Sequence, residues 1–161
     1  VSSSGKSTLA KALVKALPNY FHFSVDCYDD VINSMEDREN GHLIPIDTEY
    51  FFHQNVAMFS NKGVHLVVDH LLHNQSTLED WFATFKDYPV LFVGVHCPLE
   101  ELERRERERG DRAIGQSRAQ LAFVHQNGEK YDVEVDTYAE TANRCVEKII
   151  NKLQEREALQ K

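Results

Sequence analysis

The chain has 161 residues, 42% of them hydrophobic and 27% charged, which is ordinary for one soluble globular domain with a real core. Its net charge of −8 argues against a nucleic-acid partner, which needs a basic surface, and favours a small-molecule partner. No apolar run is long enough to span a membrane. Three cysteines without metal-ligand spacing favour buried, reduced thiols in a cytoplasmic protein: Cys27, Cys97 and Cys145.

The chain opens on the second half of a phosphate-binding loop. Gly5, Lys6 and Ser7 fill the last three places of the pattern G-x-x-x-x-G-K-[ST]. Small residues let backbone N–H groups turn toward phosphate oxygens, the lysine reaches the β- and γ-phosphates, and the serine hydroxyl ligates Mg²⁺. The alternative is a serine-rich segment before an ordinary helix. The phosphate-loop interpretation predicts nucleotide contacts from Ser3, Ser4, Gly5, Lys6, Ser7 and Thr8.

The first glycine of this pattern would precede Val1, and the strand that feeds such a loop would come before that glycine. We therefore expect a fold whose first strand is truncated. After the loop, Leu9, Leu13 and Leu17 recur at helical spacing. They predict a helix whose N-terminus points at the phosphates.

Strands and helices then alternate along the chain. Short apolar or β-branched runs predict strands at 21–25, 64–68, 90–95 and 131–135. Helices are predicted at 28–35, 49–61, 77–85, 114–124 and 138–159, and a very charged helix at 99–109 that Gly110 ends. Ser76 or Thr77 is the expected cap of the helix at 77–85, and Thr137 with Glu140 a capping box for the helix at 138–159. The alternation predicts one domain over 1–161, an α/β protein with three α/β/α layers around a parallel sheet.

Two carboxylates follow predicted strands, and ligands of parallel sheets bind beyond the carboxyl ends of strands. We expect the strands before Asp26 and Asp69 to flank the truncated strand, which would place both side chains around the phosphate loop. Asp26 would accept the proton of an attacking hydroxyl, and Asp69 would hold Mg²⁺ together with Ser7. Alternatively, each Asp is a helix cap or turn residue. A further alternative is that His70 shares the Mg²⁺-binding role of Asp69.

Arginines crowd the segment 98–118, which we expect to act as a lid. They are Arg104, Arg105, Arg107, Arg109, Arg112 and Arg118. Glutamates four residues ahead of three of them would form ion pairs on a solvated helix. This interpretation is sufficient for Arg104 and Arg107.

The remaining arginines of the segment suit a nucleotide. Arg105 lies on the same helical face as Arg109, so we expect it to contact the nucleotide. A flexible corner that starts at Gly110 would close Arg109 and Arg112 onto the γ-phosphate, as the lid of a small kinase does.

With these residues in place, the chain resembles the chloramphenicol phosphotransferase-like family of P-loop kinases over nearly its whole length. The resemblance is carried by residues 3–7, 23–26, 93–97, 105–106, 109–112 and 131–137. It implies an adenylate-kinase-like fold that moves the γ-phosphate of ATP to a hydroxyl of an antibiotic-like or metabolite acceptor. Asp26 matches the residue that the family uses as the base for this hydroxyl.

The segment 36–61, which should shape the acceptor pocket, matches the family poorly, so the resemblance does not specify chloramphenicol. Two other functions stay open. A P-loop NTPase or switch would hydrolyse ATP at a rate that no hydroxyl compound increases. A nucleotide-binding module or fragment would catalyse nothing. The guanine-reading pattern N-K-x-D is absent from the sequence, which disfavours a GTPase.

Overall fold

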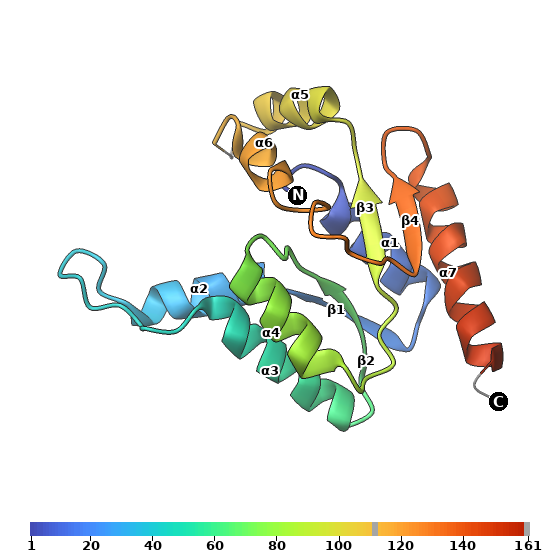
Figure 1. Cartoon of the computed structure of the whole chain (residues 1–161), viewed down its shortest axis with the longest axis horizontal. Coiled ribbons are helices and arrows are strands. Elements are labelled where there is room, and N and C mark those ends of the chain that lie inside the picture. Colours follow the sequence, from blue (N-terminus) through green and yellow to red (C-terminus); the bar gives the residue numbers. More distant parts are fainter. Residues whose placement is uncertain (111–112, 160–161) are drawn as a thin grey trace. The chain divides into compact units, whose positions relative to one another are not determined.

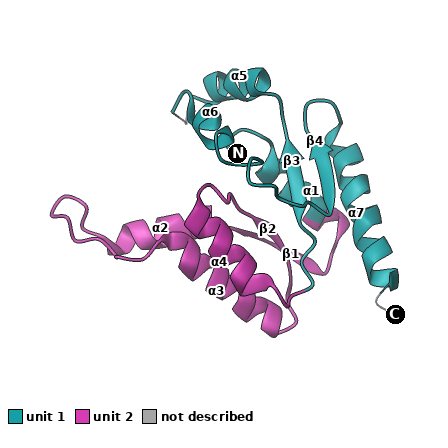
Figure 2. Ribbon diagram, in the orientation of Figure 1, with its two compact units in different colours: residues 1–13, 89–161 teal, residues 14–88 magenta. Residues whose placement is uncertain are grey.

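The computed structural model describes residues 1–110 and 113–159, which group into two compact units (Figures 1 and 2). Unit 1 comprises residues 1–13 and 89–161, and unit 2 comprises residues 14–88. Helix α1 (Lys6–Ala16) therefore begins in unit 1 and ends in unit 2. The single domain over the whole chain stays a prediction.

Unit 2 is built on a pair of parallel strands. Strands β1 (Tyr20–Ser24) and β2 (His65–Asp69) run in register, with Ser24 opposite Asp69. Helix α2 (Asp26–Met35) follows β1 directly, while α3 (Thr48–Asn61) packs on β2 and on α4 (Gln75–Phe85), which lies beside it in Figure 1. The apolar faces of the last two helices supply the core, with Phe52, Val56, Leu78, Trp81 and Phe85 buried.

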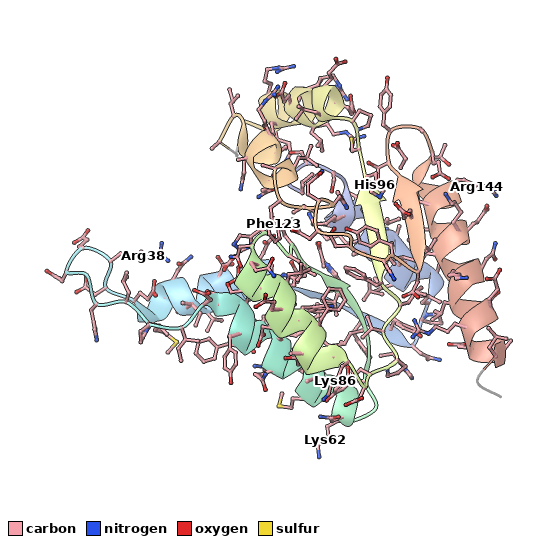
Figure 3. The ribbon with its side chains drawn as sticks, in the orientation of Figure 1. Arg38, Lys62, Lys86, His96, Phe123 and Arg144 are labelled. Atoms are coloured by element: carbon pink, nitrogen blue, oxygen red, sulfur yellow. The ribbon has the colours of Figure 1, made fainter. Side chains whose placement is uncertain are left out.

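Unit 1 repeats this plan with β3 (Val93–His96) and β4 (Val133–Asp136), which also pair in parallel. The charged helix α5 (Leu99–Arg109) leads to the short helix α6 (Gln116–Leu121), and α7 (Ala142–Leu159) packs along β4. Figure 3 labels His96 at the end of β3. The core of unit 1 includes Leu9, Leu13, Leu102, Val135, Cys145 and Ile149.

Strand β3 contains a glycine, Gly94, at a position where the neighbouring ring leaves no room for a side chain. A Cβ atom on Gly94 would lie 2.7 Å from the ring of Tyr131, closer than side chains tolerate. The ring can therefore cover the strand only where no side chain intervenes. Its hydroxyl lies 2.6 Å from Nδ1 of His125 in the same segment, and the His125 ring packs on His96 at the end of β3, with ring centroids 4.2 Å apart.

The expectation of parallel strands in an α/β protein is confirmed, but their pairing differs from the expected pattern. Within the described ranges the strands form two separate two-stranded sheets, one in each unit. The strands before Asp26 and Asp69 were expected to flank another strand, and they instead hydrogen-bond to each other. Sequence periodicity identifies a strand but carries no information about its neighbour.

Two helix starts differ from the predictions for local reasons. Helix α4 is capped by Asn74, whose amide oxygen accepts from the N–H of Thr77 over 2.8 Å. The last helix begins at Ala142 rather than Tyr138, because Asp136 and Glu140 close a turn before it: Asp136 Oδ1 accepts the N–H of Tyr138, and Glu140 accepts the N–H of Asp136.

The expectation that the three thiols are buried is confirmed for one of them only. The thiols are unpaired as expected, but only Cys145 is buried, whereas Cys27 is exposed.

Candidate active site

Residues 1–5 form the phosphate loop, which leads directly into α1. Ser3 and Gly5 adopt left-handed backbone conformations, with φ angles of 59° and 85°. Glycine adopts this conformation freely, whereas for serine it costs on the order of 1 kcal/mol, and such residues concentrate at functional sites. Left-handed residues in such a loop turn successive N–H groups toward one point, where an anion binds.

The loop lysine is already engaged by the loop backbone. Lys6 Nζ donates to the carbonyl of Val1 over 2.8 Å, and the hydroxyl of Ser4 donates to the same oxygen over 2.8 Å. Val1 and Ser4 are both buried. These bonds hold the ammonium group beside the loop, while the side chains of Ser7 and Thr8 are exposed in the first turn of α1.

The next three carbonyls of the loop each face a side-chain donor from a distant part of unit 1. The pairs are Ser2 with the hydroxyl of Ser117 at 3.1 Å, Ser3 with the guanidinium of Arg105 at 3.3 Å, and Ser4 with the hydroxyl of Thr137 at 2.7 Å. Because a peptide carbonyl and the N–H that follows it point in opposite directions, holding the carbonyls outward turns N–H groups inward. The first N–H groups of α1 have no acceptor within the helix and add to the same donor set.

Arg105 serves this loop as a brace. Its guanidinium also donates to Glu101 over 2.7 Å, to the hydroxyl of Thr137 over 3.3 Å and to the carbonyl of Thr137 over 3.1 Å. The i,i+4 pair with Glu101 was expected, and the contacts with Ser3 and Thr137 were not. Direct contact between Arg105 and a nucleotide stays a prediction.

Thr137 was assigned to a helix cap, yet its hydroxyl ties the end of β4 to the phosphate loop. Its N–H donates to the carbonyl of His96 at the end of β3, over 3.0 Å. The signal that identifies it is its position one residue beyond a parallel strand, at the edge where ligands bind.

The other arginines of α5 divide as their surroundings suggest. Arg104, whose side chain is half exposed, pairs with the exposed Glu108 and with Glu101, which is mostly covered. Glu103, which was expected to pair within the helix, instead reaches Arg118 of α6 over 2.8 Å. Arg109 is exposed in the last turn of α5. Arg112, the second expected lid residue, lies outside the described residues.

In unit 2, Asp26 is the first residue of α2 and its side chain is exposed. Asp69 ends β2 with a side chain that is only 5% exposed, and its Oδ2 lies 3.6 Å from Nε2 of His22. The two strand ends are joined by a bond of 3.2 Å from the N–H of Val25 to the carbonyl of Asp69. Unit 2 therefore carries both carboxylates at one edge of its sheet.

A buried histidine pair follows β2. The fully buried His53 bonds through Nδ1 to the carboxylate of Asp80, and its Nε2 lies 2.9 Å from Nε2 of His70. With Asp80 as acceptor, Nδ1 of His53 carries the hydrogen and His70 donates to its Nε2. Burial, opposed by Asp80, holds the pKa of His53 below its ordinary value, so His53 is neutral near pH 7.

Among the residues that the structure describes, no group of three or more His, Cys, Asp and Glu side chains could hold a metal ion. Mg²⁺ in kinases needs no such group, because one or two protein ligands, substrate phosphates and water complete its octahedron. Within the same residues, no helix is long and apolar enough to cross a membrane.

Comparisons with known proteins place this geometry in a family. The model of the chloramphenicol phosphotransferase-like protein family matches residues 1–154. A protein from two strains of Mycobacterium tuberculosis, provisionally named O-phosphotransferase, is 36% identical over 84 residues. The match covers 52% of this chain and 37% of that relative, so the chain spans well under half of its length.

Solved structures share the fold at low sequence identity. A sugar kinase from Janibacter sp. superimposes with a TM-score of 0.70 at 16% identity, over 96% of this chain and 90% of the kinase. A gluconokinase from Sinorhizobium meliloti gives 0.68 at 22%, over 99% and 91%. The fold is that of the P-loop kinases, and the protein belongs to the chloramphenicol phosphotransferase-like family.

Proposed function

We propose that this protein transfers the γ-phosphate of ATP to a hydroxyl group of a small-molecule acceptor. The observation that carries the proposal is the phosphate loop, in which the carbonyls of Val1, Ser2, Ser3 and Ser4 all accept bonds from side chains. A loop whose carbonyls are fixed in this way holds N–H groups such as that of Ser3 in place for an anion. Membership of a family named for a phosphotransferase supports the reaction class.

Each residue of the loop has a role in this reaction. A bound phosphate would replace the Val1 carbonyl as the partner of Lys6, whose charge stabilises the negative charge that develops on the γ-phosphate. Ser3, Ser4, Gly5 and Thr8 would contribute backbone or hydroxyl donors. Ser7 and Asp69 would hold Mg²⁺, which neutralises phosphate charge when bound. A cation would suit the carboxylate of Asp69, because a buried negative charge needs compensation and the His22 ring, 3.6 Å away, supplies a positive charge only when it is protonated.

Asp26 would act on the acceptor. Its carboxylate is exposed at the end of a parallel strand, where an acceptor hydroxyl could reach it. There it would orient the hydroxyl and take its proton during attack on the γ-phosphorus. Arg109 would stabilise the transferring phosphoryl group. Arg112 is assigned the same task from the sequence alone.

The test is an ATP-consumption screen of hydroxyl-bearing antibiotics and metabolites, including chloramphenicol. We expect at least one acceptor to raise ATP consumption and to gain the mass of one phosphoryl group. A Lys6→Ala variant is the control for contaminating kinases. ATP hydrolysis that no acceptor increases would contradict the transfer reaction and favour a P-loop NTPase.

A further inference from the structure

Glu106 is a carboxylate that no role in phosphate transfer requires, and it is fully buried on α5. It accepts the N–H of Gly115 over 3.0 Å, the N–H of Ser117 over 2.6 Å and the hydroxyl of Ser117. Burial acts to raise the pKa of Glu106, but these donors hold it below its ordinary value. A buried charge is retained at this position because three donors surround it.

The first task of Glu106 is to cap another helix. Gly115 occupies the N-cap position of α6 with a φ of 89°, and it has no side chain to accept the helix's N–H groups. The carboxylate from α5 takes that place. If this were its whole role, Glu106 would contribute only to the stability of unit 1.

Ser117 extends the chain of bonds to the phosphate loop. This residue is fully buried, and its hydroxyl lies between the carboxylate of Glu106 and the carbonyl of Ser2, which is 3.1 Å away. The N–H of Ser2 donates to Oε1 of Gln120, also on α6, over 2.6 Å. Both backbone groups of Ser2 are thus held by one short helix, whose start is fixed by Glu106.

We propose that Glu106 is a positioning residue for the nucleotide, which acts through Ser117 on the phosphate loop. A serine hydroxyl alone can rotate among three staggered positions. The carboxylate selects one of them, in which the single hydroxyl hydrogen of Ser117 is shared between Glu106 and the carbonyl of Ser2 and so holds that carbonyl outward. The N–H groups beyond Ser2 are then aimed at the phosphates before the nucleotide arrives. This inference rests on the proposed binding of ATP.

The chain contains a matched control on the same two helices. Glu103, one turn before Glu106, also joins α5 to α6 through an ion pair with Arg118 at 2.8 Å. That pair is partly exposed, and among the described residues it joins Glu103 to Arg118 without a hydrogen bond to the phosphate loop. A role limited to joining the two helices would be shared by Glu103 and Glu106.

The experiment measures ATP binding by titration with a fluorescent ATP analogue, and the KM and kcat of ATP consumption. For Glu106→Gln and Ser117→Ala we expect the Kd and KM for ATP to rise about tenfold, the usual worth of one hydrogen bond. We expect kcat to stay within about threefold, because the contact acts equally on ground and transition states. Glu103→Gln should change neither constant. The double variant should bind ATP no more weakly than the weaker single variant, since both act through one bond.

A merely structural role predicts a different result: fewer folded molecules, hence a lower kcat with an unchanged KM. That result, or equal effects of Glu103→Gln and Glu106→Gln, would overturn the inference. If Glu106→Gln does not fold, Ser117→Ala still decides, because alanine keeps the N–H bond to Glu106. A wild-type protein that binds no ATP would overturn the proposed function together with this inference. Normal binding by the wild type and by every variant would overturn the inference alone.

Discussion

The two units of the molecule differ sharply in charge. Residues 14–88 contain 12 Asp and Glu against 4 Lys and Arg, whereas the rest of the chain contains 14 of each kind. The whole net charge of −8 therefore belongs to unit 2. Unit 1 holds the phosphate loop, and ATP phosphates bring several negative charges that a balanced, arginine-rich unit can accommodate.

Within unit 2, four acidic residues cluster around the first turn of α2, just beyond the end of β1. Burial and then the charges of Glu49, Asp26 and Asp30 raise the pKa of Asp29 in the first turn of α2. The basic residues lie elsewhere: Figure 3 labels Arg38 on the loop between α2 and α3, and Lys62 and Lys86 at the ends of α3 and α4. The contrast teaches that nucleotide and acceptor are expected to meet surfaces of different charge.

The loss of Lys6 tests the phosphate side of this comparison and should have the largest effect. Lys6→Ala should reduce ATP consumption by about 10³-fold or more, because a charge aimed at the transferring phosphate acts most strongly in the transition state. Thermal unfolding should change little, since the residue is partly exposed. Lys11→Ala, at an exposed position on the same helix, is the control. Turnover within a few-fold of the wild type would remove the loop from catalysis.

The loss of a carboxylate in unit 2 tests the acceptor side. Asp26→Asn should preserve folding and ATP binding but lower transfer by about 10²–10⁴-fold, the usual contribution of a general base. Asparagine can still orient a hydroxyl, but it cannot take the proton. The alternative is that Asp26 only stabilises the start of α2 through the helix dipole.

Asp30→Asn separates these two interpretations, because Asp30 is also exposed on α2. It should leave transfer unchanged. Equal effects of the two substitutions on transfer would assign both residues to the charge of unit 2 rather than to proton transfer.

Two arginines of α5 sharpen the assignment of positive charge within unit 1. Arg109→Ala should lower kcat by about tenfold or more while ATP affinity changes less, as for a group that acts on transition-state charge. Arg104→Ala should be close to neutral, because the half-exposed side chain of Arg104 pairs with Glu101 and Glu108. Steady-state kinetics of both variants decide the matter. If they behave alike, the arginines of α5 form only a solvated helix.

The sequence allows most elements to be predicted, because their signals are local. Each predicted strand and helix has an observed counterpart, and the i,i+4 pair of Glu101 and Arg105 follows from helix geometry. The pairing of β1 with β2 does not follow from either strand alone. Alternation of strands and helices fixes the fold class but leaves the neighbour of each strand open.

The braces of the phosphate loop could not be predicted for the same reason. Thr137 is 133 positions from Ser4, Ser117 is 115 from Ser2, and Arg105 is 102 from Ser3. The position of Thr137 just beyond a strand indicates the ligand-binding edge, but a hydroxyl carries no signal for which distant residue it contacts, so a local role such as helix capping is the natural assignment. Such contacts arise only when β4, α5 and α6 have packed around the phosphate loop in the folded unit 1.

The charge contrast also predicts acceptor preference. Among acceptors of similar size, a neutral or amine-bearing compound should have a KM about fivefold lower than a carboxylate-bearing analogue at low salt. The difference should shrink at about 1 M salt, where the screening length falls to about 3 Å. KM values for one matched pair of compounds, at two salt concentrations, provide the measurement. A preference for the carboxylate compound would contradict the role assigned to the charge of unit 2.

Acidification should destabilise both units slightly, because each contains a histidine that is kept neutral. In unit 1, burial and then the nearby charge of His96 lower the pKa of His125 from 6.5 to about 4. The unfolded chain takes up this proton near pH 6.5, and the folded chain only near pH 4. Stability is therefore full above pH 6.5 and falls as the pH drops toward 4.

His53 adds a contribution of the same sign in unit 2. Between pH 7.5 and 5.0 we expect Tm to fall by several degrees, since about 1 kcal/mol shifts Tm by about 2–4 °C in a chain of this size. His125→Asn should reduce the fall, because asparagine does not titrate and tolerates the left-handed φ of 70° at this position. Solvent contact of the half-buried ring makes this the smallest effect. An unchanged fall in His125→Asn would show that His125 does not contribute, leaving His53 and carboxylates whose pKa is lowered on folding, such as Glu106, as its source.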